Sequence, residues 1–187
     1  MLTLLLVASA LAGWTQTNES NGCRFFKGAA EGAVVPLRAE CDWDLQPAEL
    51  MALLSKIDAH DEYFSSVEES RVVAVNGGES TVYQVHVAAG IADREAMLIY
   101  TDQDIPGGHR YAWTVAADQT GISGEKVRLA ADSGKWEVTA GAQGGSHVVY
   151  ELRYDPGGSV PGFVVRWFQG SGVRALVGEL RTWAETH

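Results

Sequence analysis

The sequence predicts an α+β protein, in which a curved antiparallel sheet of about nine strands wraps around one long C-terminal helix and encloses a cavity. Short runs of β-branched and aromatic residues follow one another from residue 70 to residue 155. The segments between them are short and rich in Gly, Asp and Asn, which favours hairpins and hence antiparallel pairing. The chain then ends on a segment whose apolar residues recur at helical spacing.

Length and charge limit the function. A chain of 187 residues with 46% hydrophobic and 20% charged residues suits one globular domain with a sizeable core. Its formal net charge of -10, from 24 acidic and 14 basic residues, disfavours tight electrostatic binding to nucleic acid or to an anionic bilayer. We therefore expect no nucleic-acid partner. The protein is also expected to be a monomer.

Residues 1–13 are predicted to be a secretory signal peptide. Their apolar run is shorter than the ~20 residues of a membrane-spanning helix, and Ala10-Leu11-Ala12 offers a cleavage pattern. No basic residue precedes the run, so a genuine N-terminal helix stays an alternative. Residues 14–22 are polar and are predicted to be a flexible lead-in to a domain spanning residues 23–187. An exported protein, periplasmic or secreted, is expected.

Cys23 and Cys41 are the only two cysteines. They stand near the outer ends of two strand-like runs, residues 23–28 and 34–43, separated by a turn. If these runs pair as a hairpin, the two sulfurs fall opposite each other and form a disulfide in an oxidising compartment. Two buried thiols stay the alternative, whereas a metal site is disfavoured because the ligand set is incomplete.

Residues 46–57 (QPAELMALLSKI) predict a short amphipathic helix that begins at a proline. The strand-like runs are residues 23–28, 34–43, 70–76, 80–88, 94–101, 109–117, 125–131, 135–141 and 146–155. Loops are predicted from composition between them, including residues 102–108 (DQDIPGG) and 132–134 (DSG).

The terminal helix is predicted to cover an apolar face of the sheet. In residues 147–155, Tyr150 and Tyr154 alternate with charged residues. One face of this predicted strand is therefore apolar and should pack against another element. A helix begun by Pro161 offers a broad apolar stripe, which Gly170 and Gly172 interrupt. A long helix laid over a curved sheet need not touch it everywhere, so an apolar cavity can remain.

This order of elements resembles the helix-grip fold of the START domains, the lipid-transfer domains related to the steroidogenic acute regulatory protein. Arg94-Glu95 is similar to the Arg-Asp pair that begins a strand in that family. The turn and terminal helix match through Asp155, Gly157 or Gly158, Pro161, Leu180 and Arg181. The similarity covers roughly residues 24–185, nearly the whole mature chain.

The resemblance implies that one lipid, of the sterol, hopanoid or phospholipid class, is held between sheet and helix and carried between membranes through transient contact. It implies no cofactor. Sterol-binding members tend to hold an arginine inside the cavity six positions after Arg94, where this sequence has Tyr100, which offers a hydroxyl but no charge.

Residues expected to line the cavity are mostly amphipathic aromatics on faces that look inward, which suits apolar walls with a few polar tips. A filled core without a ligand stays the alternative. The predicted cavity residues are Tyr83, Arg94, Leu98, Tyr100, Trp113, Tyr150, Phe163, Trp167 and Ser171. We expect two segments to move when the ligand enters, residues 103–108 and the helix around Gly170.

No catalytic or metal motif is found in the sequence. The five histidines are scattered, and His60-Asp61-Glu62 is interpreted as a solvated turn. We therefore predict a carrier without enzymatic activity. The alternative is an enzyme of the polyketide cyclase or dehydratase type on the same fold, with His86, Glu95 or Arg94 as acid or base in the pocket.

Overall fold

The computed structural model describes residues 13–32 and 34–187, apart from the side chains of Phe163, Arg166, Trp167 and Gln169. Nearly all of the predicted signal peptide therefore lies outside the described residues and stays a prediction. Among the described residues, no helix combines the length and the hydropathy needed to cross a membrane.

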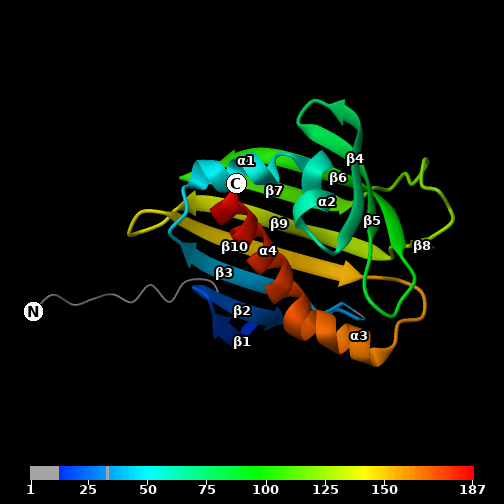
Figure 1. The fold of residues 1–187 in the computed structure, drawn as a ribbon. Helices are drawn as coiled ribbons and strands as arrows, with labels where there is room; N and C mark the ends of the chain where they lie inside the picture. The colour runs from blue at the N-terminus through cyan, green and yellow to red at the C-terminus, as the bar shows by residue number, and fades with distance from the viewer. Residues whose placement is uncertain (1–12, 33) are drawn as a thin grey trace, which may run out of the picture.

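Ten strands form one sheet (Figure 1). The strands are β1 (Trp14–Ser20), β2 (Cys23–Gly28), β3 (Leu37–Trp43), β4 (Val67–Asn76), β5 (Glu79–His86), β6 (Arg94–Ile105), β7 (Gly108–Val115), β8 (Val127–Arg128), β9 (Ala131–Ala140) and β10 (Ser146–Asp155). Their order is β1-β2-β3-β10-β9-β7-β6-β5-β4, with antiparallel neighbours throughout, and the short β8 pairs in parallel with β6.

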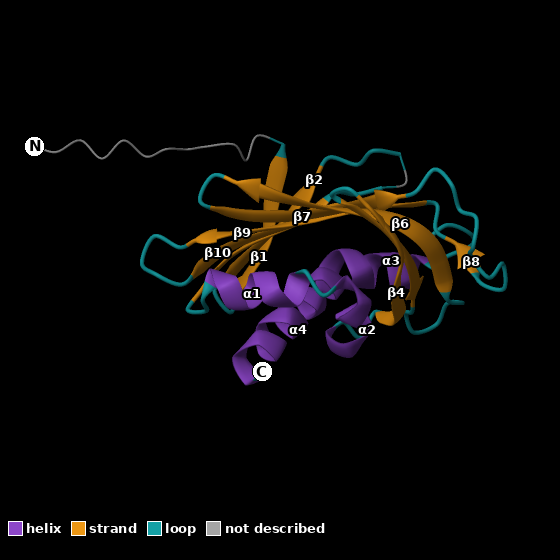
Figure 2. Cartoon of the chain, turned by 90° about the horizontal axis from the view of Figure 1, so that it is seen from above, coloured by secondary structure: helices purple, strands orange, loops and turns teal. Residues whose placement is uncertain are grey.

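All helices of the described residues cover one face of this sheet, and the sheet curves around them (Figure 2). They are α1 (Pro47–Leu54), the 3₁₀ turn η1 (Ile57–Ala59), α2 (His60–Tyr63), α3 (Gly162–Trp167), the π-helical turn η2 (Phe168–Gly172) and α4 (Val173–Thr186). The predicted α+β class and helix-grip architecture are confirmed, with ten strands where about nine were expected.

Both helix starts follow the expected chemistry. Pro47 occupies the first turn of α1, and the backbone N–H of Gln46 donates to the carboxylate of Glu49 at 3.2 Å in a capping box. Pro161 is the N-cap of α3. The glycine-containing segment predicted to interrupt the terminal helix is the π-helical turn η2, which lies between α3 and α4.

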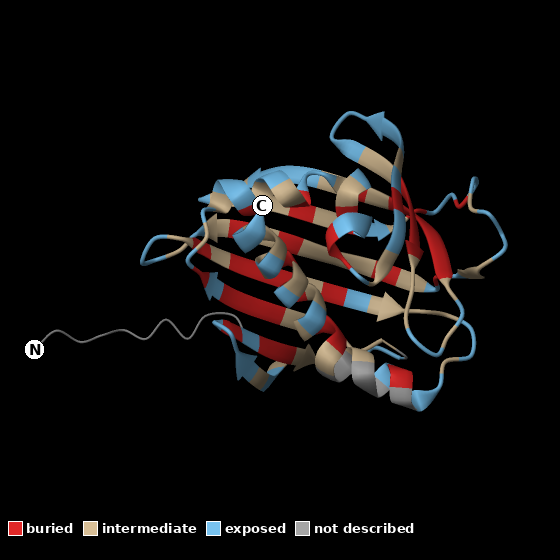
Figure 3. Ribbon diagram, viewed as in Figure 1, coloured by how far each residue is buried: buried red, intermediate tan, exposed pale blue. Residues whose placement is uncertain are grey.

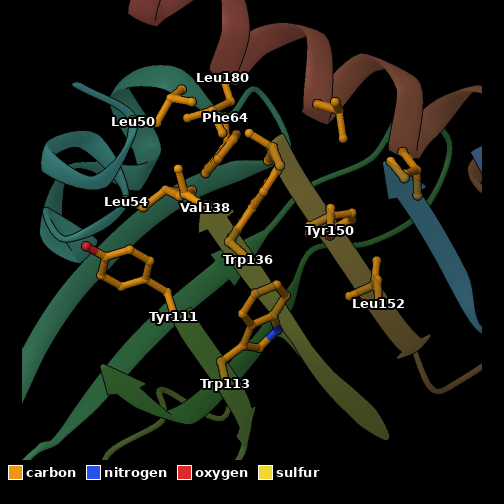
Figure 4. Packing of buried hydrophobic residues seen from close by; sticks show 14 of the residues in the cluster. Leu50, Leu54, Phe64, Tyr111, Trp113, Trp136, Val138, Tyr150, Leu152 and Leu180 are labelled. Carbon is orange, nitrogen blue, oxygen red and sulfur yellow. The ribbon is translucent and has the colours of Figure 1, made fainter. Parts of the chain in front are cut away.

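The core lies between the concave face of the sheet and the helices. Figure 3 shows buried residues gathered on the strands that α4 crosses. Leu50 and Leu180 from the helices belong to one buried cluster with Trp136 of β9 (Figure 4), and both leucines are fully buried. A smaller cluster on the opposite face contains Tyr83 and Met97. The sheet is therefore packed on both faces around β5 and β6.

Cys23 and Cys41 form the predicted disulfide. They are directly opposite in the register of β2 and β3, with their Cα atoms 4.0 Å apart. The hairpin expected from the sequence therefore brings the sulfurs together, and the alternative of two free thiols is wrong in this structure.

The prediction of a flexible lead-in at residues 14–22 is wrong for most of its length, because Trp14–Ser20 form the edge strand β1. The strand is largely exposed on both faces, so it lacks the alternation that marks a half-buried strand. The turn that follows this strand was the sequence feature that indicated a hairpin. Asn21 and Gly22 both have positive φ, 53° and 72°, as the type I′ hairpin turn requires.

Two predicted loops are parts of strands. Residues 102–105 continue β6 up to the turn at Pro106 and Gly107, and residues 132–134 lie within β9. Gly134 was predicted to be a turn glycine, but its lack of a side chain allows neighbouring groups to pack closely against β9. A Cβ built there would lie 2.4 Å from the carbonyl oxygen of Glu151 and 2.4 Å from the ring of Trp113. Conversely, only Val127–Arg128 of the predicted strand 125–131 form β8.

Candidate functional site

A cavity of about 300 Å³ lies between the concave face of the sheet and the helices. Strands β5, β6, β7, β9 and β10 provide one wall, and α2, α3, η2 and α4 provide the other. The segments around residues 87–91 and 156–160 contribute further lining, as do Val35, Ser66 and Val67. The volume is at the lower end of the range for small-molecule sites.

Most of the lining is apolar and aromatic. Trp136 and Tyr150 contact each other across neighbouring strands, with ring centroids 4.3 Å apart. Tyr154 of β10 and Phe168 of η2 lie 5.1 Å apart between centroids, so this pair joins the sheet to the terminal helix beside the cavity. Such walls favour an apolar ligand, because burial of its surface supplies the binding free energy.

Asp132 and Asp155 are the acidic residues among the described residues that line the cavity, and Asp132 is only 3% exposed. The indole Nε1–H of Trp113 donates to its Oδ1 at 2.8 Å. Burial raises the pKa of the Asp132 carboxyl to about 7, and the hydrogen bond from Trp113 opposes that rise only in part. Near neutral pH this carboxyl exchanges between its neutral and charged forms.

Gln84 connects the other polar groups of the wall. Its amide oxygen accepts from Nε2–H of His86 at 3.1 Å and from the hydroxyl of Tyr100 at 3.4 Å. Its amide nitrogen donates to Ser70 Oγ at 2.9 Å and lies 3.5 Å from Nδ1 of His60. Burial lowers the pKa of both His60 and His86 to about 4, so both imidazoles are neutral at physiological pH.

Arg94 lies at the end of the wall where β6 begins and is nearly fully buried. Its guanidinium donates to the backbone carbonyls of Ala92, Pro156 and Gly157. These contacts join the segment before β6 to the turn that leads into the terminal helix. Part of the donor capacity of this cation is therefore used by the protein's own backbone.

A family model described as polyketide cyclase/dehydrase and lipid transport matches residues 35–185, which include every strand from β3 onward and the terminal helix. The chain belongs to this family.

Solved structures show the same fold. Human StAR-related lipid transfer protein 5 superposes with a TM-score of 0.84 at 14% identity, over 94% of this chain and 88% of that one. The STAR-related lipid transfer protein of Xanthomonas axonopodis gives a TM-score of 0.81 at 19% identity, over 93% and 99%. An uncharacterized protein of Pseudomonas aeruginosa is 21% identical over 181 residues, which cover 90% of this chain and 89% of that protein. The START-type helix-grip fold is thus shown, and fold and family together support a hydrophobic ligand as the occupant of the cavity.

Within this member of the family, the cavity brings together four of the predicted residues. Arg94, Tyr100, Trp113 and Tyr150 all line it. Leu98 is buried in the core, and neither it nor Ser171 is among the lining residues, whereas the neighbouring Gly172 is. The side chains of Phe163 and Trp167 lie outside the described residues, so their role stays a prediction.

The prediction for Tyr83 is wrong, because its side chain lies on the opposite face of the sheet. Its hydroxyl donates to Oε2 of Glu95 at 2.9 Å. Successive residues of a strand point to opposite faces, so the inward position of β5 at this level belongs to Gln84. The aromatic character of Tyr83 suggested the wrong face.

Glu95 also lies away from the cavity, so it is not an acid or base of the site. Its carboxylate accepts from the backbone N–H groups of Ser123, Gly124 and Lys126 and from the hydroxyls of Ser123 and Tyr83. Burial alone would raise its pKa, but the hydrogen bonds from Ser123, Tyr83 and Gly124 lower it to about 2. Glu95 is thus an anion that holds the loop between β7 and β8.

Sequence reasoning missed Asp132 and Gln84 and misplaced His60. Asp132 was assigned to a turn, although it stands four residues before Trp136 in an alternating run, which places both side chains on one face. His60 was assigned to a solvated turn, but it is buried and lines the cavity. Residues 103–108, expected to move for ligand entry, belong to the β6–β7 hairpin and do not line the cavity.

Proposed function

We propose that the protein binds one hydrophobic lipid in the cavity and carries it between membranes or to a partner protein. The observation that carries the proposal is the cavity itself, whose mainly apolar wall is closed by a helix that packs back onto the sheet. The family, whose description includes lipid transport, supports the same activity. The ligand belongs to the sterol, hopanoid or phospholipid class, and the protein acts as a monomer.

Transfer requires a transient membrane contact near the cavity. Val165 of α3 lines the cavity and is also 37% exposed, so an apolar side chain borders both ligand and solvent. A net charge of -10 disfavours adhesion to an anionic surface, so the contact is with apolar or zwitterionic lipid. The ligand enters where α3 and the segments near residues 87–91 and 156–160 border the cavity, rather than at residues 103–108.

Export to the periplasm or the outside of the cell completes the proposal. The disulfide between Cys23 and Cys41 supports it, because such bonds persist in oxidising compartments.

Native mass spectrometry of protein purified from its source, followed by lipid extraction, tests binding directly. One bound lipid per chain is expected. Transfer is then measured between labelled donor and unlabelled acceptor vesicles of zwitterionic lipid. Val164→Trp, which fills the cavity, should abolish uptake, whereas Ala175→Trp on the exposed side of α4 should not. Unchanged uptake by a folded Val164→Trp variant would contradict the proposal.

A second candidate, an acid–base enzyme of the cyclase or dehydratase type, is favoured by one observation. The Asp132 carboxyl and the His86 imidazole both reach the cavity, with Oδ2 and Nδ1 3.9 Å apart. Turnover of an added polyketide-like substrate that is lost in Asp132→Asn would support the enzyme, whereas recovery of unmodified lipid supports the carrier.

A further inference from the structure

Two polar atoms of the cavity wall face each other without bonding. Oδ2 of Asp132 lies 3.9 Å from Nδ1 of His86, which is beyond hydrogen-bonding distance. The other carboxyl oxygen already accepts the indole N–H of Trp113. Within the described part of the chain, neither Oδ2 nor Nδ1 has a hydrogen-bond partner. Both atoms belong to residues that line the cavity, so their free hydrogen-bonding capacity is available to a bound ligand.

The hydrogens of this wall follow from the neighbouring bonds. Ser70 donates its hydroxyl hydrogen to the carbonyl of Ile57 at 2.6 Å, so its oxygen can only accept from Gln84. The Gln84 side-chain atom that faces Ser70 is therefore the amide nitrogen. The amide oxygen of Gln84 therefore faces His86 and receives the hydrogen of Nε2. In the neutral imidazole, Nδ1 is then a lone-pair acceptor, and it points toward Asp132.

We propose that Asp132 and His86 form a seat for a single hydroxyl group on the buried end of the ligand, which makes the ligand a neutral, apolar alcohol. The protonated Oδ2 of Asp132 donates to the ligand oxygen, and the ligand hydroxyl donates to Nδ1 of His86. A hydroxyl suits this pair because it accepts one hydrogen bond and donates one. The inference rests on the proposed function, since it names the end group of the lipid.

The electrostatics of the site support a neutral end group. Burial raises the pKa of Asp132 to about 7 and lowers that of His86 to about 4, so both groups are mainly uncharged just below neutral pH. A carboxylate or phosphate in the same place would meet an acidic oxygen and a lone pair. Arg94, the only Lys or Arg among the described lining residues, already donates to three backbone carbonyls.

Aromatic rings hold the seat in place. The ring of Tyr154 is nearly parallel to the imidazole of His86, at 16° and 5.8 Å between centroids. Trp113, which bonds to Asp132, stacks between Tyr100 and Tyr150 at 5.9 and 6.0 Å. Both polar side chains are therefore oriented before a ligand arrives, which reduces the entropy lost on binding.

The test uses four probes with the same twelve-carbon chain, namely dodecanol, methyl dodecyl ether, dodecanoate and dodecylamine. Their affinities are measured at pH 6 by displacement of the neutral dye Nile red from the full-length protein. Dodecanol should bind about 10- to 100-fold more tightly than the ether, which accepts but cannot donate. The carboxylate and the amine should also bind more weakly than the alcohol.

Three variants separate the seat from the apolar wall. His86→Phe keeps a ring beside Tyr154 but removes the acceptor. The affinity of this variant for dodecanol should therefore fall to its affinity for the ether. Asp132→Asn should keep most of the preference, because its amide N–H replaces the acid O–H as donor. Val160→Ala, which only trims the wall, should weaken both probes by the same factor. Affinity for the ether serves as the check that each variant is folded.

Equal binding of alcohol and ether by the wild type would overturn the hydroxyl seat while leaving a lipid carrier in place. That result would indicate that a bound water molecule, rather than a ligand hydroxyl, lies between Asp132 and His86. Tighter binding of dodecylamine would replace the alcohol by a cation, and tighter binding of dodecanoate would replace it by an anion, so either overturns the proposal. Failure of all four probes would overturn the seat and the proposed function together.

Discussion

The indole nitrogen of Trp113 donates a 2.8 Å hydrogen bond to the buried carboxyl of Asp132. The two residues come from β7 and β9, and Gly134, two positions after Asp132, lies directly opposite Trp113 in the register. The missing side chain of Gly134 is what lets the indole lie flat enough against β9 to reach the carboxyl.

Gly134→Ala should therefore displace the indole and destabilise the protein. A Cβ at this position lies 2.4 Å from both a backbone oxygen and the indole ring, and the backbone cannot move aside easily. We expect a loss of roughly 2 kcal/mol or more in the free energy of unfolding and a changed near-ultraviolet circular dichroism spectrum. Gly178→Ala on α4 is the control, because nothing lies within 4 Å of its Cβ, and it should stabilise by about 0.5 kcal/mol. Equal effects of the two variants would refute this role of Gly134.

Asp132 should make the protein less stable as the pH rises from 4 to 7. Its pKa is raised from 3.8 to about 7 in the folded state, so the folded chain binds the proton more tightly than the unfolded chain. The resulting stabilisation is fully present below pH 3.8 and is lost as the pH rises through 7. His60 and His86, whose pKa values fall from 6.5 to about 4, act in the opposite direction over nearly the same range.

Asp132→Asn isolates the carboxyl from the two histidines. Wild-type and variant proteins are compared by urea denaturation at several pH values. The stability of the wild type minus that of the variant should fall by roughly 4 kcal/mol between pH 4 and pH 7.5, which corresponds to the pKa change from 3.8 to about 7. A difference that stays constant with pH would show that Asp132 is not the group responsible.

Glu95→Gln should loosen the loop between β7 and β8. The carboxylate accepts three backbone N–H groups there, and removal of its charge weakens each bond. We expect a loss of about 2 to 4 kcal/mol and faster hydrogen exchange at residues 123–126. Because its pKa is lowered from 4.5 to about 2, its contribution is present above pH 4.5 and disappears as the pH falls through 2. The exposed neighbour Glu125→Gln should change little.

The disulfide should contribute measurably to stability. Thiol alkylation followed by mass measurement should find no free thiol until a reductant is added. The double variant Cys23→Ala/Cys41→Ala should lose about 3 kcal/mol, because the bond closes a segment with a sequence separation of 18. Free thiols in correctly exported protein, or unchanged stability of the double variant, would contradict this prediction.

The large features of the fold were predictable because each had a local signal. Leu50 and its partners repeat at helical spacing in α1, Pro161 precedes the terminal helix, and the cysteines follow from one hairpin. The edge strand β1 was missed because an exposed strand lacks the alternation of apolar and polar residues by which strands are recognised in a sequence. Its Asn21-Gly22 turn was the overlooked signal.

The candidate site was less predictable, because the sequence does not reveal which residues meet across strands. Tyr100 and Trp113 are directly opposite in β6 and β7, and both were expected in the cavity. Tyr83 was placed on the wrong face through its chemistry rather than its position in the alternation. Asp132 was hidden in a segment whose composition is that of a turn, and the close approach of Trp113 and of the Glu151 carbonyl explains the glycine two positions later.

The pairing of β3 with β10 has a consequence for how the chain folds. Trp43 lies opposite Ser146, so the N-terminal hairpins join the sheet only when the last strand is available. The β2–β3 hairpin and its disulfide are local, and they can form while the rest of the chain is still unstructured. Closing the sheet then brings together segments distant in sequence, which is the slow step in proteins of high contact order. The oxidised β2–β3 hairpin can therefore form first. The cavity forms only after β10 and the terminal helix that follows it have packed into place.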